Sequence, residues 1–93
     1  MESIMQGKKE CYACGTTRGL ESHHVIYGTA NRKLSERYGL KVWLCRYHHT
    51  GSNQAVHFNK DFDLHLKKEA QKAFEKYHGS REHFVRIFGK NHL

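Results

Sequence analysis

Two pairs of metal-binding side chains constrain this sequence more than any other feature. Cys11 and Cys14 are separated by two residues, and after thirty intervening residues Cys45 and His48 repeat that spacing. Thiolate and imidazole donors in two close pairs are typical of a tetrahedral zinc site, whose closed shell leaves no position for a substrate. Because an unfolded chain rarely has such a site preformed, metal binding is coupled to folding. We therefore predict a structural zinc ion held by Cys11, Cys14, Cys45 and His48.

The cysteine count and the chain length support this interpretation. The chain has 93 residues and three cysteines. An odd number of cysteines suits a disulfide framework poorly, and Met1–Gly7 lacks the apolar core of a secretory signal, so we expect a reducing, cytoplasmic setting. No apolar run approaches the roughly 18 residues that span a bilayer. The alternatives for the cysteines are three buried free thiols or a redox pair, and the redox pair needs a following helix where Gly15–Gly19 resembles a turn.

Periodic patterns predict an α+β fold in a single domain spanning residues 1–93. Residues 11–58 contain two β-branched, alternating runs, which predict strands at 20–26 and 40–45. The segment between them includes 31–38, where apolar residues four apart indicate a short helical turn. Strand, connection and strand predict an antiparallel pair.

The two ends of the chain carry different patterns. Residues 1–10 are polar, show no periodicity and are expected to be flexible. Residues 59–93 are expected to be helical: an amphipathic helix begins near Asn59, and a last helix is capped by Ser80 and closed by Gly89. We therefore predict two C-terminal helices after the zinc-binding part.

The charge of the chain favours a polyanionic partner. The formal net charge is +7 at pH 7, and each cation placed on a phosphate releases condensed counterions. Binding at a membrane surface would need a basic amphipathic helix with an exposed aromatic residue, whereas Trp43 lies in a strand-like run. We expect DNA as the partner and no membrane, although a solvated charged face is an alternative for each cation. The candidate phosphate ligands are Arg32, Lys33, Arg37, Lys67, Lys68 and Lys72.

Four histidines near the cysteine pairs form a second candidate site. His23 and His24 are adjacent in a predicted strand, so their side chains point to opposite faces. If His48 completes the zinc site, His49 is free to face that strand, and His57 follows shortly after. A lone histidine is more often an ordinary core or surface residue. These histidines differ because they flank predicted zinc ligands.

The order of these motifs carries a family resemblance. The Cys-x-x-Cys pair is followed by the strand Leu20–Ile26 with its two histidines, and then by Val42–Cys45 with His48 and His49 beyond it. This order, over about residues 11–57, resembles the HNH endonucleases of the ββα-metal finger class, in particular the small HNH proteins of phages. The resemblance implies a zinc-stabilised finger, made of an antiparallel hairpin and a short helix, followed by the two C-terminal helices.

The same resemblance implies a metal-dependent DNA endonuclease with low sequence specificity. His24 would be the general base, and His23, His49 and His57 would hold a second divalent ion such as Mg²⁺, Mn²⁺, Ni²⁺ or Zn²⁺. An imidazole can take a proton from water near neutral pH, while the ion stabilises charge on the phosphate and the leaving 3′ oxygen. The expected products carry 5′ phosphate and 3′ hydroxyl ends. Many relatives have cysteine in place of His48, which leaves open a swap in which His49 binds zinc.

The sequence also departs from the family pattern around the second metal. The family's central asparagine has no match at Gly39 or Leu40, and Asn31 is the nearest substitute. A site made only of imidazoles suits a transition metal better than Mg²⁺, because hard cations favour oxygen ligands. Asp61 or Asp63 would supply such an oxygen only if the loop folds back. The sequence therefore leaves the identity of the second ion open.

A function from a different class is also compatible with these motifs. A non-catalytic zinc-finger module could bind nucleic acid or a protein, as a phage inhibitor or regulator does, and a zinc-stabilised structural subunit is a third possibility. Both leave the four histidines without a role. For the nuclease, 93 residues provide little room for a separate recognition element. Specificity would then come from a partner, such as a phage or host recombination or packaging protein.

Overall fold

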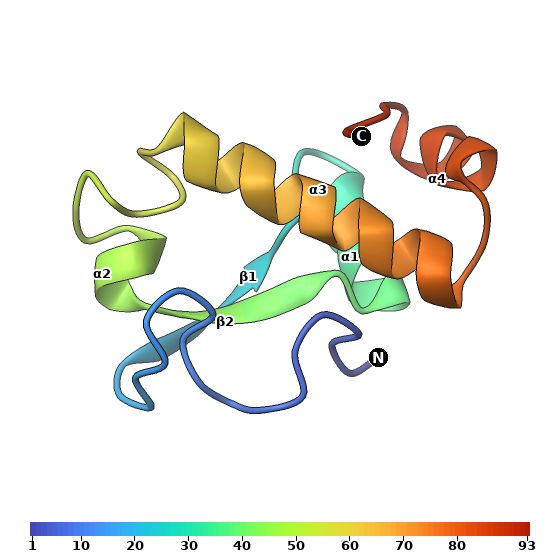
Figure 1. Cartoon of the computed structure of the whole chain (residues 1–93). Coiled ribbons are helices and arrows are strands. Elements are labelled where there is room, and N and C mark those ends of the chain that lie inside the picture. Colours follow the sequence, from blue (N-terminus) through green and yellow to red (C-terminus); the bar gives the residue numbers. More distant parts are fainter.

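The computed structural model describes residues 1–93 and has an α+β architecture built on one two-stranded antiparallel sheet (Figure 1). None of its helices has the length and apolar character required to cross a membrane. In chain order the elements are β1 Leu20–His24, α1 Asn31–Tyr38, β2 Lys41–Cys45, α2 Arg46–His49, α3 Lys60–Tyr77 and α4 Arg81–Phe88. Both predicted strands, the helical turn between them and the two C-terminal helices are therefore confirmed.

The register of the sheet decides which side chains share a face. Ser22 pairs with Trp43 and His24 with Lys41, while His23 pairs with Val42. Because side chains alternate across a strand, the first two pairs lie on one face and the third lies on the other. His23 and Val42 are buried. Adjacent histidines in β1 are thus directed to opposite sides of the hairpin, as their sequence positions predict.

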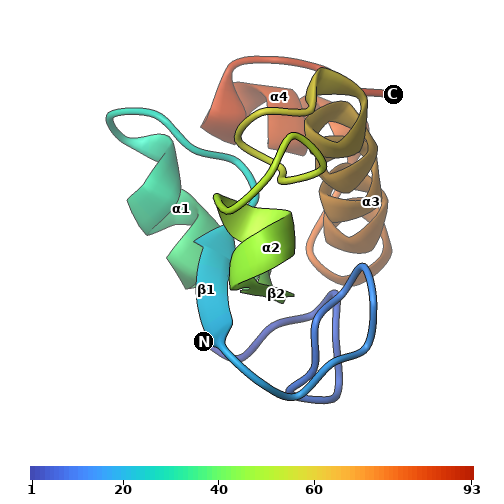
Figure 2. The ribbon, with the colours of Figure 1, turned by 90° about the vertical axis from the view of Figure 1, so that its left-hand side faces the viewer.

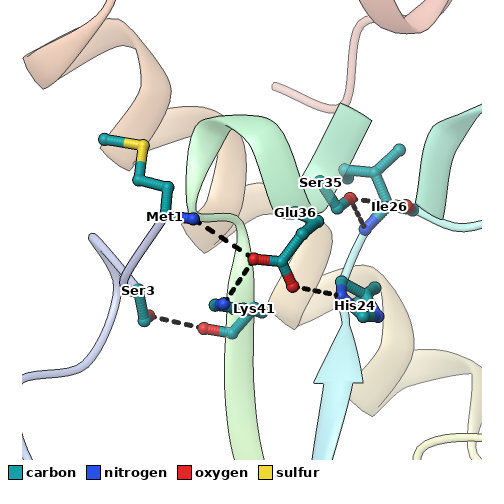
Figure 3. Close-up of polar contacts among 7 residues, drawn as sticks. All are labelled: Met1, Ser3, His24, Ile26, Ser35, Glu36 and Lys41. Carbon is teal, nitrogen blue, oxygen red and sulfur yellow. Dashed lines mark hydrogen bonds and ion pairs between the residues drawn. The ribbon is translucent and has the colours of Figure 1, made fainter. Parts of the chain in front are cut away.

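Helix α1 lies in the connection between the strands and is tied to the end of β1. The buried Ser35 hydroxyl donates to the Ile26 carbonyl oxygen at 2.6 Å and accepts from the Ile26 N–H at 3.2 Å (Figure 3). The Leu40 N–H donates to the Ser35 carbonyl oxygen, and the Val25 N–H donates to the Leu40 carbonyl oxygen. These bonds satisfy buried backbone groups after the regular ladder ends. They explain why β1 ends at His24 although the predicted strand continues to Ile26.

The long helix α3 lies along one side of the hairpin (Figures 1 and 2) and contributes Leu66, Ala70 and Phe74 to the core. Its start is fixed by Asn59, whose side chain accepts from the Phe62 N–H at 3.0 Å. Leu66, Ala70 and Phe74 recur every four residues and are completely buried. The Phe74 ring lies edge to face with that of Phe84 in α4, with centroids 5.3 Å apart.

The N-terminal segment, for which the sequence predicts flexibility, is hydrogen-bonded to the hairpin. The Ile4 N–H donates to the Gly39 carbonyl oxygen at 2.9 Å, and the Gln6 side-chain oxygen accepts from the Trp43 N–H at 2.8 Å. Residues 4–6 therefore run along β2 at its edge opposite β1, and Ile4 and Met5 also line a hollow with Ala73 and Tyr77 of α3. Covering the edge of a two-stranded sheet satisfies its free backbone groups. Such pairing uses backbone groups and isolated polar side chains such as Gln6, and it leaves no periodic pattern in the sequence.

The glycine that ends α1 gives a test of this packing. Gly39 has φ +72°, and a Cβ atom there would collide with the Glu2 carbonyl oxygen, whereas Gly89 has φ +83° with open space around it. Both Gly→Ala changes impose left-handed strain of about 1–2 kcal/mol. We expect Gly39→Ala to lower the free energy of unfolding more than Gly89→Ala does, measured by urea denaturation. It should also accelerate hydrogen exchange at the Ile4 amide. Equal destabilisation with unchanged exchange at Ile4 would contradict the packing of residues 1–10.

Candidate metal centres and the histidine cleft

The two predicted pairs of zinc ligands meet at the junction of β2 and α2. Cys14 Sγ lies 3.8 Å from Cys45 Sγ. His48 Nδ1 lies 3.3 Å from Cys45 Sγ and 3.8 Å from Cys11 Sγ. The first pair is held in a tight turn, in which Gly15 has φ +78° and its N–H donates to the Cys11 carbonyl oxygen at 2.8 Å. The four donor atoms therefore surround one point.

These separations fit a tetrahedral metal ion. Zn–S bonds of about 2.3 Å at tetrahedral angles place two sulfur atoms roughly 3.8 Å apart, as Cys14 and Cys45 are. Burial alone would raise the pKa of the Cys11 thiol, but hydrogen bonds from the backbone at Cys45, Cys14 and Ala13 lower it to about 6. A thiolate is the form that binds metal. The chain thus contains a Cys₃His site suited to a structural metal such as zinc.

The structure assigns the two adjacent histidines of α2 to different clusters. Helix α2 has only four residues, and successive side chains on a helix diverge by about 100°. His48 lies with the cysteines, whereas His49 lies with His23 and His57. The alternative in which His49 completes the cysteine site is therefore not the arrangement found.

His23, His49 and His57 form the second cluster, with one ring nitrogen of each within 4.8 Å of the others. His49 Nε2 and His57 Nε2 are 3.2 Å apart. His57 is brought to this place because the chain turns back after α2: the Val56 N–H donates to the His48 carbonyl oxygen at 2.8 Å. The predicted group of three histidines is thus assembled from β1, α2 and the loop before α3.

His23 is the unusual member of this cluster. Its side chain is buried, with 3% of the residue exposed, and its Nε2 atom has no hydrogen-bond partner. A buried polar atom without a partner is costly, so such an atom requires an explanation. Burial, followed by the neighbouring His49 and His57, lowers the pKa of His23 to about 3. A neutral imidazole with a free lone pair beside two further imidazoles has the donor chemistry of a metal site.

Glu21 supports this cluster from the same strand as His23. Its Oε1 atom lies 2.8 Å from His49 Nδ1 and accepts a hydrogen bond when that nitrogen carries the proton. Such a bond leaves His49 Nε2 as the lone-pair atom and orients the ring, as carboxylates do behind metal-binding histidines. Burial and the nearby His49 also lower the pKa of His57, which favours its neutral form. The carboxylate of Glu21 was not among the predicted site residues.

His24 has a different set of contacts, on the other face of the hairpin. Its Nε2 atom lies 3.0 Å from Glu36 Oε1, and the other oxygen of this carboxylate accepts from Lys41 Nζ at 2.6 Å and from the Met1 amino group (Figure 3). The bond to Lys41, followed by that to His24, lowers the pKa of Glu36 to about 2. An ionised Glu36 holds a proton on His24 Nε2, which leaves Nδ1 as the lone-pair atom.

His23 and His24 nevertheless open onto one cleft of about 570 Å³. Arg32 also lines it and contributes positive charge. The full lining consists of Ser22, His23, His24, Tyr27, Gly28, Thr29, Arg32, His49 and His57. The four histidines that the family resemblance implies are thus brought together in one concave surface. Asn31, the nearest substitute for the family asparagine, begins α1 and does not line the cleft.

The predicted phosphate ligands on α3 are less available than those on α1. Lys67 Nζ is paired with Asp63 at 2.8 Å, and Lys72 lies 3.7 Å from Glu69. Lys68 is exposed. The amphipathic pattern places these lysines off the apolar stripe but cannot reveal partners one turn away. Lys67 in particular has its charge already compensated by Asp63.

Arg32, Lys33 and Arg37 of α1 are all exposed and belong to no ion pair of the structure. Asp63, considered as an oxygen ligand, is buried and does not join the three histidines within ligand distance. Its Oδ1 atom has no hydrogen-bond partner. The structure therefore keeps the second cluster as a set of imidazoles.

Comparison with known proteins adds no relative: no family model, curated protein or solved structure matches the chain.

The separation of His48 from His49 yields a prediction about metal content. His48→Ala should abolish tight binding of one zinc ion per chain and unfold much of the domain, because the cysteine site loses a ligand. The His49→Ala variant should keep that zinc ion, and its far-ultraviolet circular dichroism spectrum should match that of the unchanged protein. Zinc can be measured by mass spectrometry after exhaustive dialysis. Loss of tightly bound zinc in His49→Ala, with retention in His48→Ala, would reverse the assignment.

Proposed function

We propose that this protein is a metal-dependent endonuclease that hydrolyses phosphodiester bonds in DNA. The observation that carries the proposal is the buried His23 Nε2 atom without a partner, beside His49 and His57 and in the same cleft as His24. In this interpretation β1, β2 and α2 form a ββα-metal finger. The net charge of +7 supports a polyanionic substrate.

The three clustered histidines would hold the catalytic ion. A divalent ion bound there would supply positive charge for the phosphoryl oxygen and for the leaving 3′ oxygen. The donor set contains only nitrogen, which favours Zn²⁺ or Ni²⁺ over Mg²⁺. Glu21 would maintain the ligand form of His49 through the bond at 2.8 Å.

His24 would act as the general base through its Nδ1 atom. Water attacks phosphorus while this nitrogen takes one of its protons, and the bond from phosphorus to the 3′ oxygen breaks. The departing oxygen acquires a proton from solvent, so one water molecule is consumed and no redox change occurs. Glu36 acts as a positioning residue, because its bond at 3.0 Å fixes the ring and the protonated nitrogen of His24. Arg32 at the cleft would attract the phosphate group.

The proposal is tested by nicking of supercoiled plasmid. Zinc-loaded protein is incubated with EDTA or with added Mg²⁺, Mn²⁺, Ni²⁺ or Zn²⁺, and nicked product is followed on agarose gels. We expect nicking that depends on an added transition metal. Because a positioned base contributes about 10²–10⁴-fold, His24→Ala should lower the rate by that factor.

The matched control is His65→Ala, which removes an exposed histidine of α3 that does not line the cleft. It should nick at the rate of the unchanged protein, and both variants should retain zinc. Equal rates for His24→Ala and the unchanged protein would reject His24 as the base. Absence of nicking with every metal would reject the nuclease and favour the non-catalytic nucleic-acid-binding module.

A further inference from the structure

A second hollow, of about 430 Å³, lies between the N-terminal segment and the hairpin. Lys41 and Trp43 of β2 line it together with Ser22, on the face of the sheet that also carries His24. Lys8 and Lys9 close it from the N-terminal side. The hollow lies in the size range of roughly 300–1,000 Å³ found for small-molecule sites, and its lining is mainly polar.

The positive charge in this hollow is available for a ligand. Lys8 and Lys9 are exposed, and neither belongs to an ion pair of the structure. Lys41 differs, because Glu36 already compensates its charge at 2.6 Å. Glu2 adds one carboxylate to the lining. Two free ammonium groups therefore outweigh one exposed carboxylate at the rim.

Trp43, the single tryptophan of the chain, adds an aromatic surface beside these cations. Lys9 Nζ lies 4.6 Å from the centre of its ring. Trp43 is half-buried, whereas Lys9 is exposed, and an exposed cation is only weakly held by a ring, so Lys9 can exchange the ring for a phosphate. Aromatic rings combined with basic groups are the elements that bind single-stranded nucleic acid, because an unpaired base can stack while its phosphates are neutralised.

The hollow adjoins the histidine cleft at Ser22. Ser22 lines both concavities, and on β1 it stands two residues from His24 on the same face. A strand whose phosphate lies at the histidines can therefore pass over Ser22 toward Trp43. Its next phosphates then approach Lys8 and Lys9.

We propose that this hollow binds an unpaired DNA segment next to the scissile phosphate, with a base on Trp43 and phosphates on Lys8 and Lys9. The direction of the strand rests on the proposed nuclease function, whereas binding itself does not. The N-terminal segment is then part of the substrate site, and the enzyme prefers DNA that is single-stranded beside the cut.

Binding is measured by fluorescence anisotropy of a labelled single-stranded oligonucleotide with zinc-loaded protein and no other divalent metal. The double variant Lys8→Ala/Lys9→Ala should weaken binding about tenfold. The slope of log Kd against log salt concentration should fall by the amount that corresponds to about two phosphate contacts. The control is Lys76→Ala/Lys90→Ala, which removes the same charge from two exposed lysines outside both concavities. Equal losses in the two double variants would overturn the proposal.

Emission from Trp43 gives an independent readout on the unchanged protein. Stacking of a base should quench this emission as an unlabelled oligonucleotide is added, with the Kd found by anisotropy. Binding without any change in emission would overturn the contact with Trp43. Quenching and lysine-dependent binding without plasmid nicking would leave this inference standing and reject only the nuclease. Nicking together with binding that does not depend on Lys8 and Lys9 would leave the nuclease proposal standing and reject this inference.

Discussion

The link between the Cys11–Cys14 turn and the junction of β2 and α2 is the interaction on which the structure depends. It reinforces a contact that the buried Cys11 and Cys45 side chains and the bond from the Tyr12 N–H to the Trp43 carbonyl oxygen also make, in a turn that lies outside every helix and strand. At this junction Cys14 Sγ lies 3.8 Å from Cys45 Sγ, and His48 Nδ1 lies 3.3 Å from Cys45 Sγ and 3.8 Å from Cys11 Sγ. Without a metal these polar groups would be brought together with little compensation, so folding and metal binding are coupled.

The same link determines where the second cluster lies. His48 and His49 are neighbours on a helix of four residues, so holding His48 among the cysteines also directs His49 away from them. The backbone bond from Val56 to His48 then brings His57 beside His49. One structural site thus positions two of the three histidines around the unpartnered atom of His23. The cleft that we propose to be catalytic inherits its geometry from the cysteine site.

Features encoded locally could be predicted from the sequence. The two closely spaced Cys/His pairs identified the first cluster, and the capping residues Asn59, Ser80 and Gly89 located the two C-terminal helices. The three histidines of the second cluster, which are distant in the chain, were assigned to one metal ion only through the family resemblance. The alternation along β1 likewise predicted that His23 and His24 diverge.

Features that depend on distant partners could not be predicted in this way. Glu36 meets His24 only because α1 packs beside β1, and a residue of that kind carries no motif. Glu21 is nearer to a local pattern, since it lies two residues before His23 on the same face, yet its partner His49 is 28 positions away. The packing of residues 1–10 on β2 uses backbone groups and isolated polar side chains such as Gln6, which leave no periodic pattern in the sequence. The ion pair of Lys67 with Asp63 shows that a correct helix does not by itself identify its free charges.

The central claim is that the chain has two separate metal sites, one of which uses His23 Nε2. Crystals of zinc-loaded protein grown with Mn²⁺ can test it by anomalous scattering measured at the zinc edge and at a wavelength where manganese dominates. The account predicts zinc at bonding distance from Cys11, Cys14, Cys45 and His48, and a second ion bound to His23, His49 and His57. A fully occupied cysteine site with no second ion at His23, at saturating Mn²⁺ or Zn²⁺, would contradict it.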